Sequence, residues 1–412
     1  MTETAFAFNP FADGFAEDPY PHYAQLRAAA PAYEHPLGFW IISRYEDVSR
    51  LQRSAHSVDE ANLTRLPRWK SDSGALGREN RMMRGLAVLD QDPPDHTRLR
   101  RLVAAPFTRR GAAALLPRIE AIVEAALDRI AAAGRAGRAG RADGADVVAE
   151  LAFPLPFTVI SEVLGIPVTG QDRVRELTGT LALGLEPLAQ PAVQEAVRAA
   201  NEELTLIVRE LTGWKRRHPG DDLISALIAA SDEGALTEDE LIAQVMFLYI
   251  AGHETTANLI AGGILALLRH YDQYRLLQRD PGLAANAIEE LLRYDTPVHL
   301  MRRVTTEPLS VGGQQIPAGS WVLAALAAAN RDPSYWGVTA GELRLDRPNA
   351  HLNVSFGAGA HHCLGAGLAR LEAQVAITGF ARRFPAAELV DVRWNGRINV
   401  RGPKTLTITT TP

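Results

Sequence analysis

The sequence contains one cysteine, Cys363, within the run Ser355-Phe-Gly-Ala-Gly-Ala-His-His-Cys-Leu-Gly-Ala-Gly367. A free cysteine is usually a small buried hydrophobic residue. Here glycines surround it, and glycine lets the backbone pass close to a flat or bulky group. A helical run follows over residues 364–383, and the positive end of a helix dipole favours a thiolate. A thiolate presented in this way is a soft ligand for iron.

A long apolar run over residues 241–268 contains the polar cluster Gly252-His-Glu-Thr-Thr256. Thr237 and Glu240 have the spacing of a capping box at the start of this run. Because the run is apolar on nearly all faces, it predicts a buried central helix, roughly 40 Å long. A membrane span is the competing interpretation, and the polar residues in mid-run argue against it because they are costly in lipid.

Two further segments carry charges at helical spacing. Glu290 and Arg293 lie at i, i+3 and therefore share one helix face. In the run 92–101, the prolines suit a first helical turn, and His96 and Arg100 then project in the same direction. An arginine guanidinium is well matched to a carboxylate group.

Taken together, these segments resemble the cytochrome P-450 superfamily. The resemblance covers nearly the whole chain, from Asp18-Pro-Tyr-Pro-His22 to Val400-Arg-Gly402. The matching segments are the haem-binding loop Phe356-x-x-Gly359-x-x-x-Cys363-x-Gly365, the oxygen-activation cluster Ala251-Gly-His-Glu-Thr-Thr-Ala-Asn258, the Glu290-x-x-Arg293 pair and the run 92–101.

The resemblance implies a mainly α fold with a smaller β lobe, in which haem lies between the long central helix and the cysteine loop. It implies one haem domain over residues 1–412, without a fused reductase. The cofactor is heme b, with Cys363 as the iron ligand. The resemblance assigns cofactor contacts to His96, Arg100, Arg303, His361, Phe356, Gly357, Gly365 and Ala251.

The resemblance further implies a haem-thiolate monooxygenase that inserts one oxygen atom from O2 into an apolar small molecule, by hydroxylation, epoxidation or dealkylation. Thr255 is expected to hydrogen-bond the bound oxygen, and Glu254 to supply protons. The Thr255 and Thr256 hydroxyls can also bond to a carbonyl one turn earlier, which predicts an opening of the helix beside Gly252.

Other positions follow from the same resemblance. Glu290, Arg293 and Arg347 form a buried cluster that holds the cysteine loop in place. The expected substrate pocket consists of Leu86, Ala87, Val88, Phe247, Leu248, Ala251, Gly252, Val298, Leu300, Met301, Asn399 and Val400.

Electrons are expected from a separate ferredoxin with an NAD(P)H-dependent reductase. A set of cations near the cysteine-side face could steer an acidic ferredoxin, with a plain solvated surface as the alternative. The set comprises Arg98, Arg100, Arg101, Arg109 and Arg110, with His362 beside the ligand.

Composition sets limits on location and partners. The chain has 412 residues and a net charge of −5, which implies no general attraction to nucleic acid. A single cysteine allows no internal disulfide, which suits a reducing cytoplasm. Residues 1–21 contain no apolar core for a signal peptide or membrane anchor. With the resemblance, which is to the soluble bacterial members of the family, these features lead us to expect a cytoplasmic protein. We also expect a monomer.

Alternative functions remain at this stage. The chain could use peroxide directly or catalyse a rearrangement, although Glu254 and Thr255 together favour dioxygen activation. A haem-based sensor or carrier would need neither residue. A zinc site at His361-His362-Cys363 is disfavoured, because adjacent residues rarely supply a tetrahedral set.

The remaining pattern predicts the elements around these sites. Residues 39–42 and 406–408 read as strands, and 311–316 and 394–397 as hairpin turns. Residues 51–90 read as irregular, and 178–191 as a break between two helices that forms a lid. The Gly-Arg-Ala repeat over 134–144 reads as an exposed connector, with a basic interaction site as the alternative.

Overall fold

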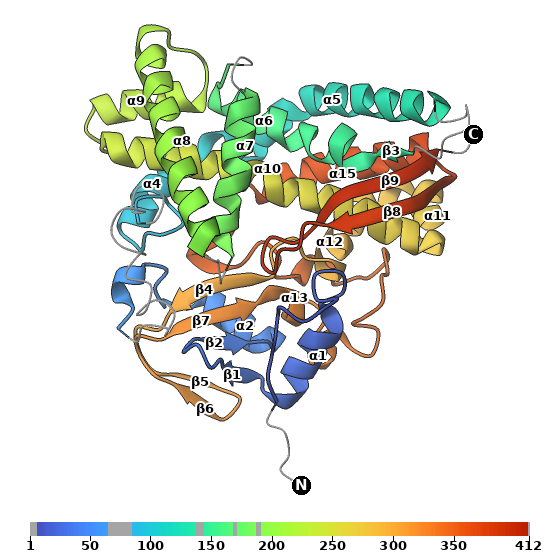
Figure 1. The fold of residues 1–412 in the computed structure, drawn as a ribbon, viewed down its shortest axis with the longest axis horizontal. Coiled ribbons are helices and arrows are strands. Elements are labelled where there is room, and N and C mark those ends of the chain that lie inside the picture. Colours follow the sequence, from blue (N-terminus) through green and yellow to red (C-terminus); the bar gives the residue numbers. More distant parts are fainter. Residues whose placement is uncertain (1–5, 65–84, 137–143, 168–170, 187–190, 411–412) are drawn as a thin grey trace.

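The computed structural model of the chain describes residues 6–64, 85–136, 144–167, 171–186 and 191–410. Most helices gather in one region of the molecule and most strands in the other (Figure 1). The helices are α1 (Tyr20–Ala29), α2 (Tyr45–Arg53), α4 (Asp95–Val103), α5 (Arg109–Ala136), α6 (Pro154–Leu164), α7 (Gln171–Ala182), α8 (Pro191–Arg217), α9 (Leu223–Asp232), α10 (Glu238–Arg269), α11 (Tyr271–Arg279), α12 (Ala284–Tyr294), α13 (Leu326–Ala329), α14 (Pro333–Trp336) and α15 (Ala366–Arg383).

The strands form three sheets. A four-stranded sheet has the order β1-β2-β7-β4, and β2 and β7 are its parallel pair. A hairpin of β5 and β6 and a sheet of order β3-β9-β8 complete the set. The bounds are β1 (Ala32–Glu34), β2 (Trp40–Ile42), β3 (Ala145–Asp146), β4 (Leu300–Val304), β5 (Leu309–Val311), β6 (Gln314–Ile316), β7 (Trp321–Ala325), β8 (Ala387–Trp394) and β9 (Pro403–Thr410).

Helix α10 is the centre of the helical region. The Thr237 hydroxyl accepts from the Glu240 N–H at 3.2 Å, and the Glu240 carboxylate accepts from the Thr237 N–H at 2.7 Å. This confirms the capping box and the buried central helix. The predicted opening beside Gly252 is wrong, because α10 is helical without interruption from residue 238 to 269. The Thr255 hydroxyl shares the Ala251 carbonyl without displacing the helical bond.

Both faces of the four-stranded sheet are buried. Successive side chains of a strand point to opposite sides, so neighbouring residues of one strand pack in different hydrophobic clusters. Trp40 and Ile42 of β2 pack in one hydrophobic cluster with Val48 and Leu51 of α2. Ile41 packs in another cluster with Leu26 of α1. The sheet is therefore held between α2 and the N-terminal segment, and residues of β4 and of α10 line the same cavity.

Several predicted local elements are confirmed. Residues 40–42 and 403–410 form strands, and Gly312 and Gly313 make the β5–β6 turn with φ of +56° and +81°. The predicted tight turn at 394–397 is wrong, since a loop over residues 395–402 separates β8 from β9. Helix α7 ends at Ala182 and α8 begins at Pro191, so the predicted helix break is present. Parts of three predicted segments, 65–84, 137–143 and 187–190, lie outside the described residues.

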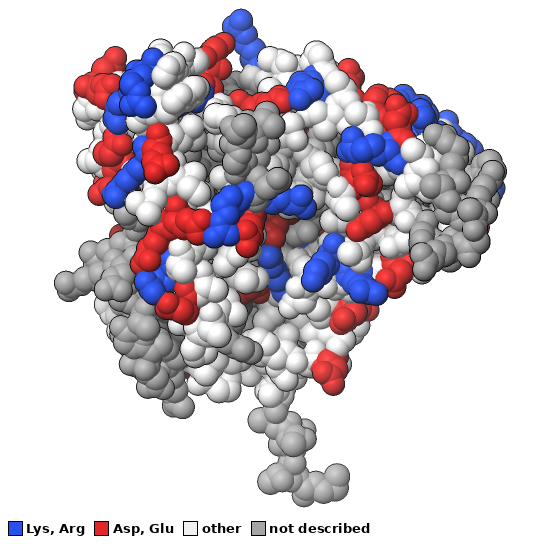
Figure 2. All heavy atoms as spheres, turned by 45° about the horizontal axis from the view of Figure 1, so that its top comes forward, with Lys and Arg blue, Asp and Glu red and all other residues white. Residues whose placement is uncertain are grey.

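The described surface matches the sequence composition. On the face shown in Figure 2, acidic and basic side chains are interspersed, in keeping with the net charge of −5. Among the described helices, α10 included, none combines the length and the apolar character that a membrane crossing requires.

Candidate active site

The loop that carries Cys363 folds back against α2. The Cys363 N–H donates to the Phe356 carbonyl at 2.8 Å and closes the loop. Gly359 has a φ of +73°, and a Cβ there would lie 2.7 Å from the carbonyl oxygen of Gln52 in α2. Only glycine therefore allows this close approach. The loop then leads directly into α15.

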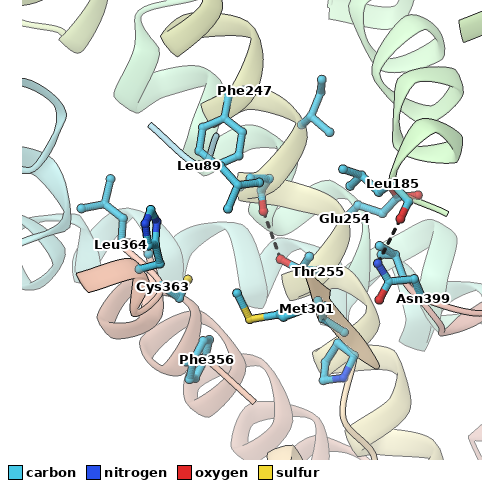
Figure 3. A pocket seen from close by; sticks show the side chains of 18 of the residues that line it. Leu89, Leu185, Phe247, Glu254, Thr255, Met301, Phe356, Cys363, Leu364 and Asn399 are labelled. Carbon is cyan, nitrogen blue, oxygen red and sulfur yellow. Dashed lines mark hydrogen bonds between the residues drawn. The ribbon is translucent and has the colours of Figure 1, made fainter. Parts of the chain in front are cut away.

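The Cys363 side chain is accessible from a cavity inside the molecule, and Figure 3 shows its sulfur directed into that space. Burial raises the pKa of its thiol, and the backbone N–H groups of Gly365 and Ala366 lower it less. The helix start thus favours the thiolate as expected, but in the polypeptide alone burial outweighs this effect. A bound metal cation would deprotonate the sulfur.

Helix α10 forms another wall of this cavity, with Ala251, Gly252 and Thr255 on its lining face. A Cβ at Gly252 would lie 2.7 Å from the Cγ1 atom of Ile160, so glycine lets α6 pack closely here. The Thr255 hydroxyl donates to the Ala251 carbonyl at 3.0 Å (Figure 3).

Glu254 is a largely buried acid on the same helix. Its Oε1 atom is ion-paired with Arg397, while Oε2 has no hydrogen-bond partner among the described residues. Burial raises the pKa of Glu254, and Arg397 opposes this effect. The carboxyl group therefore has one atom fastened to a cation and one free for a proton or a water molecule.

Four basic side chains meet at one part of the cavity. The rings of His96 and His361 lie 4.1 Å apart, and burial lowers the pKa of His361 to about 3. Arg303 donates to the Arg302 carbonyl at 2.8 Å, and burial lowers its pKa to about 10. Arg100 donates to the backbone carbonyl beside Cys363 at 2.8 Å.

This arrangement fits a haem. Cys363 offers a sulfur ligand, and α10 faces the same space from another side. The Nε2 atom of His96 is buried without a hydrogen-bond partner among the described residues. Together with the Arg303 guanidinium on the cavity wall, it can serve carboxylate groups. Cys363 is the one cysteine of the sequence, so it would supply the thiolate ligand of the iron.

The cavity has a volume of about 440 Å³ and a mainly apolar lining. The structure brings most sequence-predicted positions together on it: Val88, His96, Arg100, Phe247, Leu248, Ala251, Gly252, Glu254, Thr255, Val298, Leu300, Met301, Arg303, Phe356, His361, Cys363, Gly365, Asn399 and Val400.

Three predicted positions do not line the cavity: Leu86, Ala87 and Gly357. Gln244 of α10 holds the backbone on both sides of Ala87. Its side-chain amide donates to the Leu86 carbonyl at 2.8 Å and accepts from the Val88 N–H at 2.9 Å. Val88 and Leu89 consequently face the cavity. Gly357 is turned toward Gln52 and Met301 instead.

Sequence reasoning missed several lining residues, among them Leu89, Leu185, Glu186, Asn201 and Glu372. Glu372 lies in α15 with 2% of its surface exposed, and its Oε2 atom has no partner in the described structure. Burial raises its pKa well above the usual value, which favours the protonated acid. A single acid within a helix leaves no pattern that could identify it.

Glu290, Arg293 and Arg347 form a buried ion cluster. Arg293 and Arg347 reach the Glu290 carboxylate at 2.7 and 3.0 Å, and each side chain is at most 5% exposed. Arg293 also donates to the carbonyls of Asn330, Ala340 and Glu342. The cluster thus ties α12 to the chain segment that leads to the cysteine loop.

The cations near the cysteine side are not equivalent. Arg98 is committed to Glu240 at 2.5 Å and to Asp95 at 2.9 Å. Arg101, Arg109 and Arg110 are exposed. Only the last three are therefore placed to meet an acidic partner in solution.

Comparison with known proteins gives a consistent result. A family model described as "Cytochrome P450" matches residues 185–280 and 282–393. Cytochrome P450 107B1 of Saccharopolyspora erythraea is 40% identical over 97% of this chain and 96% of its own length. Cytochrome P450 monooxygenase PikC of Streptomyces venezuelae is 39% identical over 96% of this chain and 91% of its own.

Solved structures agree with these relatives. P450BioI, solved in complex with an acyl carrier protein ligated to hexadec-9Z-enoic acid, matches with a TM-score of 0.86 and 31% identity. That match covers 96% of this chain and 99% of the other. The tirandamycin C-bound P450 monooxygenase TamI matches with a TM-score of 0.83 and 36% identity, over 97% and 99% of the two chains.

Proposed function

The chain belongs to the cytochrome P450 family, and from that premise we propose that it oxygenates an apolar small molecule with electrons from a separate ferredoxin. As a member of the family it is a haem-thiolate monooxygenase that uses O2 and a redox partner. The observation that carries the proposal is the apolar cavity that connects Cys363 with Thr255 and Glu254.

The proposed cofactor is heme b, in a single domain formed by the whole chain. Cys363 would bind the iron, and His96, Arg100, Arg303 and His361 would meet the carboxylates. Thiolate-bound haem supplies the oxygen chemistry, because donation from sulfur favours O–O cleavage. Phe356, Gly365 and Ala251 would lie against the flat macrocycle, where their small or planar side chains leave room.

Thr255 and Glu254 would provide the proton delivery. The Thr255 hydroxyl now donates to Ala251, and a small rotation would let it donate into the cavity instead. Glu254 has one carboxylate oxygen without a partner, which can hold or pass a proton through water. Arg397 fixes the other oxygen and so orients the group.

The lining favours an elongated or polycyclic apolar substrate. Phe247, Leu248, Val298 and Met301 give it apolar walls, and Asn201 has a side-chain oxygen without a hydrogen-bond partner among the described residues. Such a lining selects by shape, with a few hydrogen bonds that set orientation. Relatives named as a nocardicin C N-oxygenase and a vitamin D(3) 25-hydroxylase show the breadth of substrates that this family accepts.

For the redox partner, we propose that an acidic ferredoxin docks over Arg101, Arg109 and Arg110. These exposed cations lie in and after α4, whose Arg100 contacts the cysteine loop directly. Electrostatic steering would speed association and weaken with added salt. We further propose a monomer in the bacterial cytoplasm, where a single unpaired cysteine would stay reduced.

The first test is spectroscopic. Reduced protein exposed to carbon monoxide should show the red-shifted Soret band of thiolate-bound haem. A band at the histidine-ligated position would refute the role of Cys363.

A second test identifies the electron route and the substrate class. A panel of macrolides, fatty acids and steroids is screened for the low-to-high spin shift of the haem. The best compound is then turned over with NADPH, spinach ferredoxin and its reductase, and separately with hydrogen peroxide. Faster product formation with peroxide than with ferredoxin would reject the proposed function in favour of a peroxide-using enzyme.

A further inference from the structure

The segment at the end of α7 is fastened to the loop between β8 and β9. The Glu186 carboxylate accepts the backbone N–H groups of Ile398, Asn399 and Val400, at 2.8, 3.0 and 3.2 Å. The Asn399 side chain donates to the Leu185 carbonyl at 3.0 Å (Figure 3). One carboxylate thus satisfies three consecutive amides that no strand partner serves.

The same loop carries the cation that holds Glu254. Arg397 precedes the three amides directly, and its guanidinium reaches both Glu254 and the Gly179 carbonyl of α7. Arg397 and Glu254 are 13% and 16% exposed, so solvent screens this ion pair weakly.

The loop is braced so that its parts move together. The Arg397 N–H donates to the Asn395 side chain at 3.1 Å, and that side chain donates to the Val400 carbonyl at 2.9 Å. The Asn395 N–H donates to the Gly402 carbonyl at 3.0 Å. A displacement of residues 398–400 would therefore also displace Arg397.

We propose that Glu186 is a positioning residue: by holding the backbone of residues 398–400 it keeps Arg397 on Glu254, and so couples coverage of the pocket to the orientation of the proton-delivering acid. The inference rests on the proposed role of Glu254. Leu185 and Glu186 line the cavity together with Glu254 and Asn399, so a substrate that displaces this segment acts on all four positions at once.

The electrostatics of Glu254 give the coupling a consequence. Burial raises the pKa of Glu254, Arg397 lowers it, and the negative charge of Glu186 raises it further. With the loop in place, the ion pair favours the carboxylate and fixes its orientation. Without the loop, burial favours a protonated acid that is free to rotate. Glu186 therefore acts through the loop, against its own direct charge repulsion with Glu254, and needs no contact with substrate or haem.

Backbone hydrogen exchange tests the first link, with the holoprotein. Glu186→Ala should speed the exchange of the amides of residues 398–400 about tenfold, because each loses its charged acceptor. Glu186→Gln keeps one acceptor oxygen and should give an intermediate rate, which also covers the case in which the alanine variant folds poorly. Glu195→Ala, on the exposed face of α8, is the matched control and should leave these amides unchanged. Exchange at the native rate in Glu186→Ala would overturn the proposal.

Chemical labelling tests the second link. Phenylglyoxal modifies accessible arginines, and mass spectrometry of the peptide over 394–402 reports Arg397. In Glu186→Ala the labelling rate should rise several-fold toward that of Glu254→Gln, which removes the ion pair itself. Unchanged labelling of Arg397 would show that Glu186 does not hold it.

Turnover then separates this inference from the proposed function. With the panel compound of largest spin shift, Glu186→Ala and Glu254→Gln should both lower the ratio of product to NADPH consumed, and Glu195→Ala should not. A loss in Glu254→Gln alone would overturn the coupling and leave the proposed role of Glu254 intact. No loss in Glu254→Gln would overturn that role, and the coupling with it.

Discussion

The Thr255 hydroxyl lies one helical turn from the Ala251 carbonyl and donates to it at 3.0 Å, on the face of α10 that lines the cavity. This places a hydroxyl group beside the cavity that Cys363 also lines. The bond restrains the side chain without interrupting the helix. It is therefore a resting position from which the hydroxyl can turn inward.

Thr255→Ala should keep haem binding and lose coupling. Product per NADPH should fall at least about tenfold, with a matching rise in hydrogen peroxide, because proton delivery typically contributes a hundredfold or more. Thr255→Ser keeps the hydroxyl and is the control that should retain coupling. Equal coupling in the alanine variant and the native protein would rule out this role.

Replacement of the cysteine ligand should change the spectrum. Cys363→Ser removes the soft sulfur ligand, so the reduced protein with carbon monoxide should lack the red-shifted Soret band. His362→Ala is the matched control, because the neighbouring contact to Arg100 uses the His362 backbone and not its side chain. A red-shifted band in the serine variant would contradict thiolate ligation.

The buried Glu290 cluster should contribute far more to the free energy of unfolding than an exposed ion pair does. Glu290→Gln leaves Arg293 and Arg347 without their counter-charge, and breaking a buried pair typically costs about 3–5 kcal/mol. Glu124→Gln breaks an exposed pair with Arg382 and should cost less than about 1 kcal/mol. Urea unfolding followed by circular dichroism measures both. Equal losses of unfolding free energy in the two variants would show that the cluster stabilises the fold no more than an exposed ion pair.

Glu372 should make stability depend on pH. Its pKa in the folded protein is raised well above the ordinary value of 4.5 by burial. Below about pH 4.5 both folded and unfolded states hold the proton. As pH rises further, only the unfolded state releases it, so the native protein loses stability until the folded pKa is reached.

Glu372→Gln removes this titration. The free energy of unfolding of the variant, relative to that of the native protein, should increase by about 1.4 kcal/mol for each pH unit above the pKa of Glu372 in the unfolded state. Thermal unfolding at pH 5, 6, 7 and 8 measures the difference between the two proteins. A difference that stays constant over this range would mean that Glu372 is ionised in the folded state.

The features predicted well from the sequence are local ones. The capping box of Thr237 and Glu240 and the β5–β6 turn each depend on residues a few positions apart. The family resemblance extended this to positions on several elements, and most of them meet at one cavity. The prediction that Leu86 lines the pocket is wrong, because the hydrogen bond from Gln244, far along the chain, decides which side of this segment faces the cavity.

The ion pair of Glu254 with Arg397 could not be anticipated from the sequence. The two residues are 143 positions apart, and the Asn-Gly before Arg397 suggested a tight hairpin turn. The actual loop is longer, and the Glu186 carboxylate accepts from the backbone N–H groups of Ile398 and Val400 in it. Such pairings depend on how distant elements pack, and charge pattern alone does not encode them.

The single thiol of this sequence also has a practical consequence. A maleimide added to haem-free protein can attach at one atom only, the sulfur of Cys363, which is reachable through the cavity. Iron coordination would block the same atom. The mass of the intact protein after labelling would therefore count vacant cofactor sites molecule by molecule, independently of absorbance or turnover.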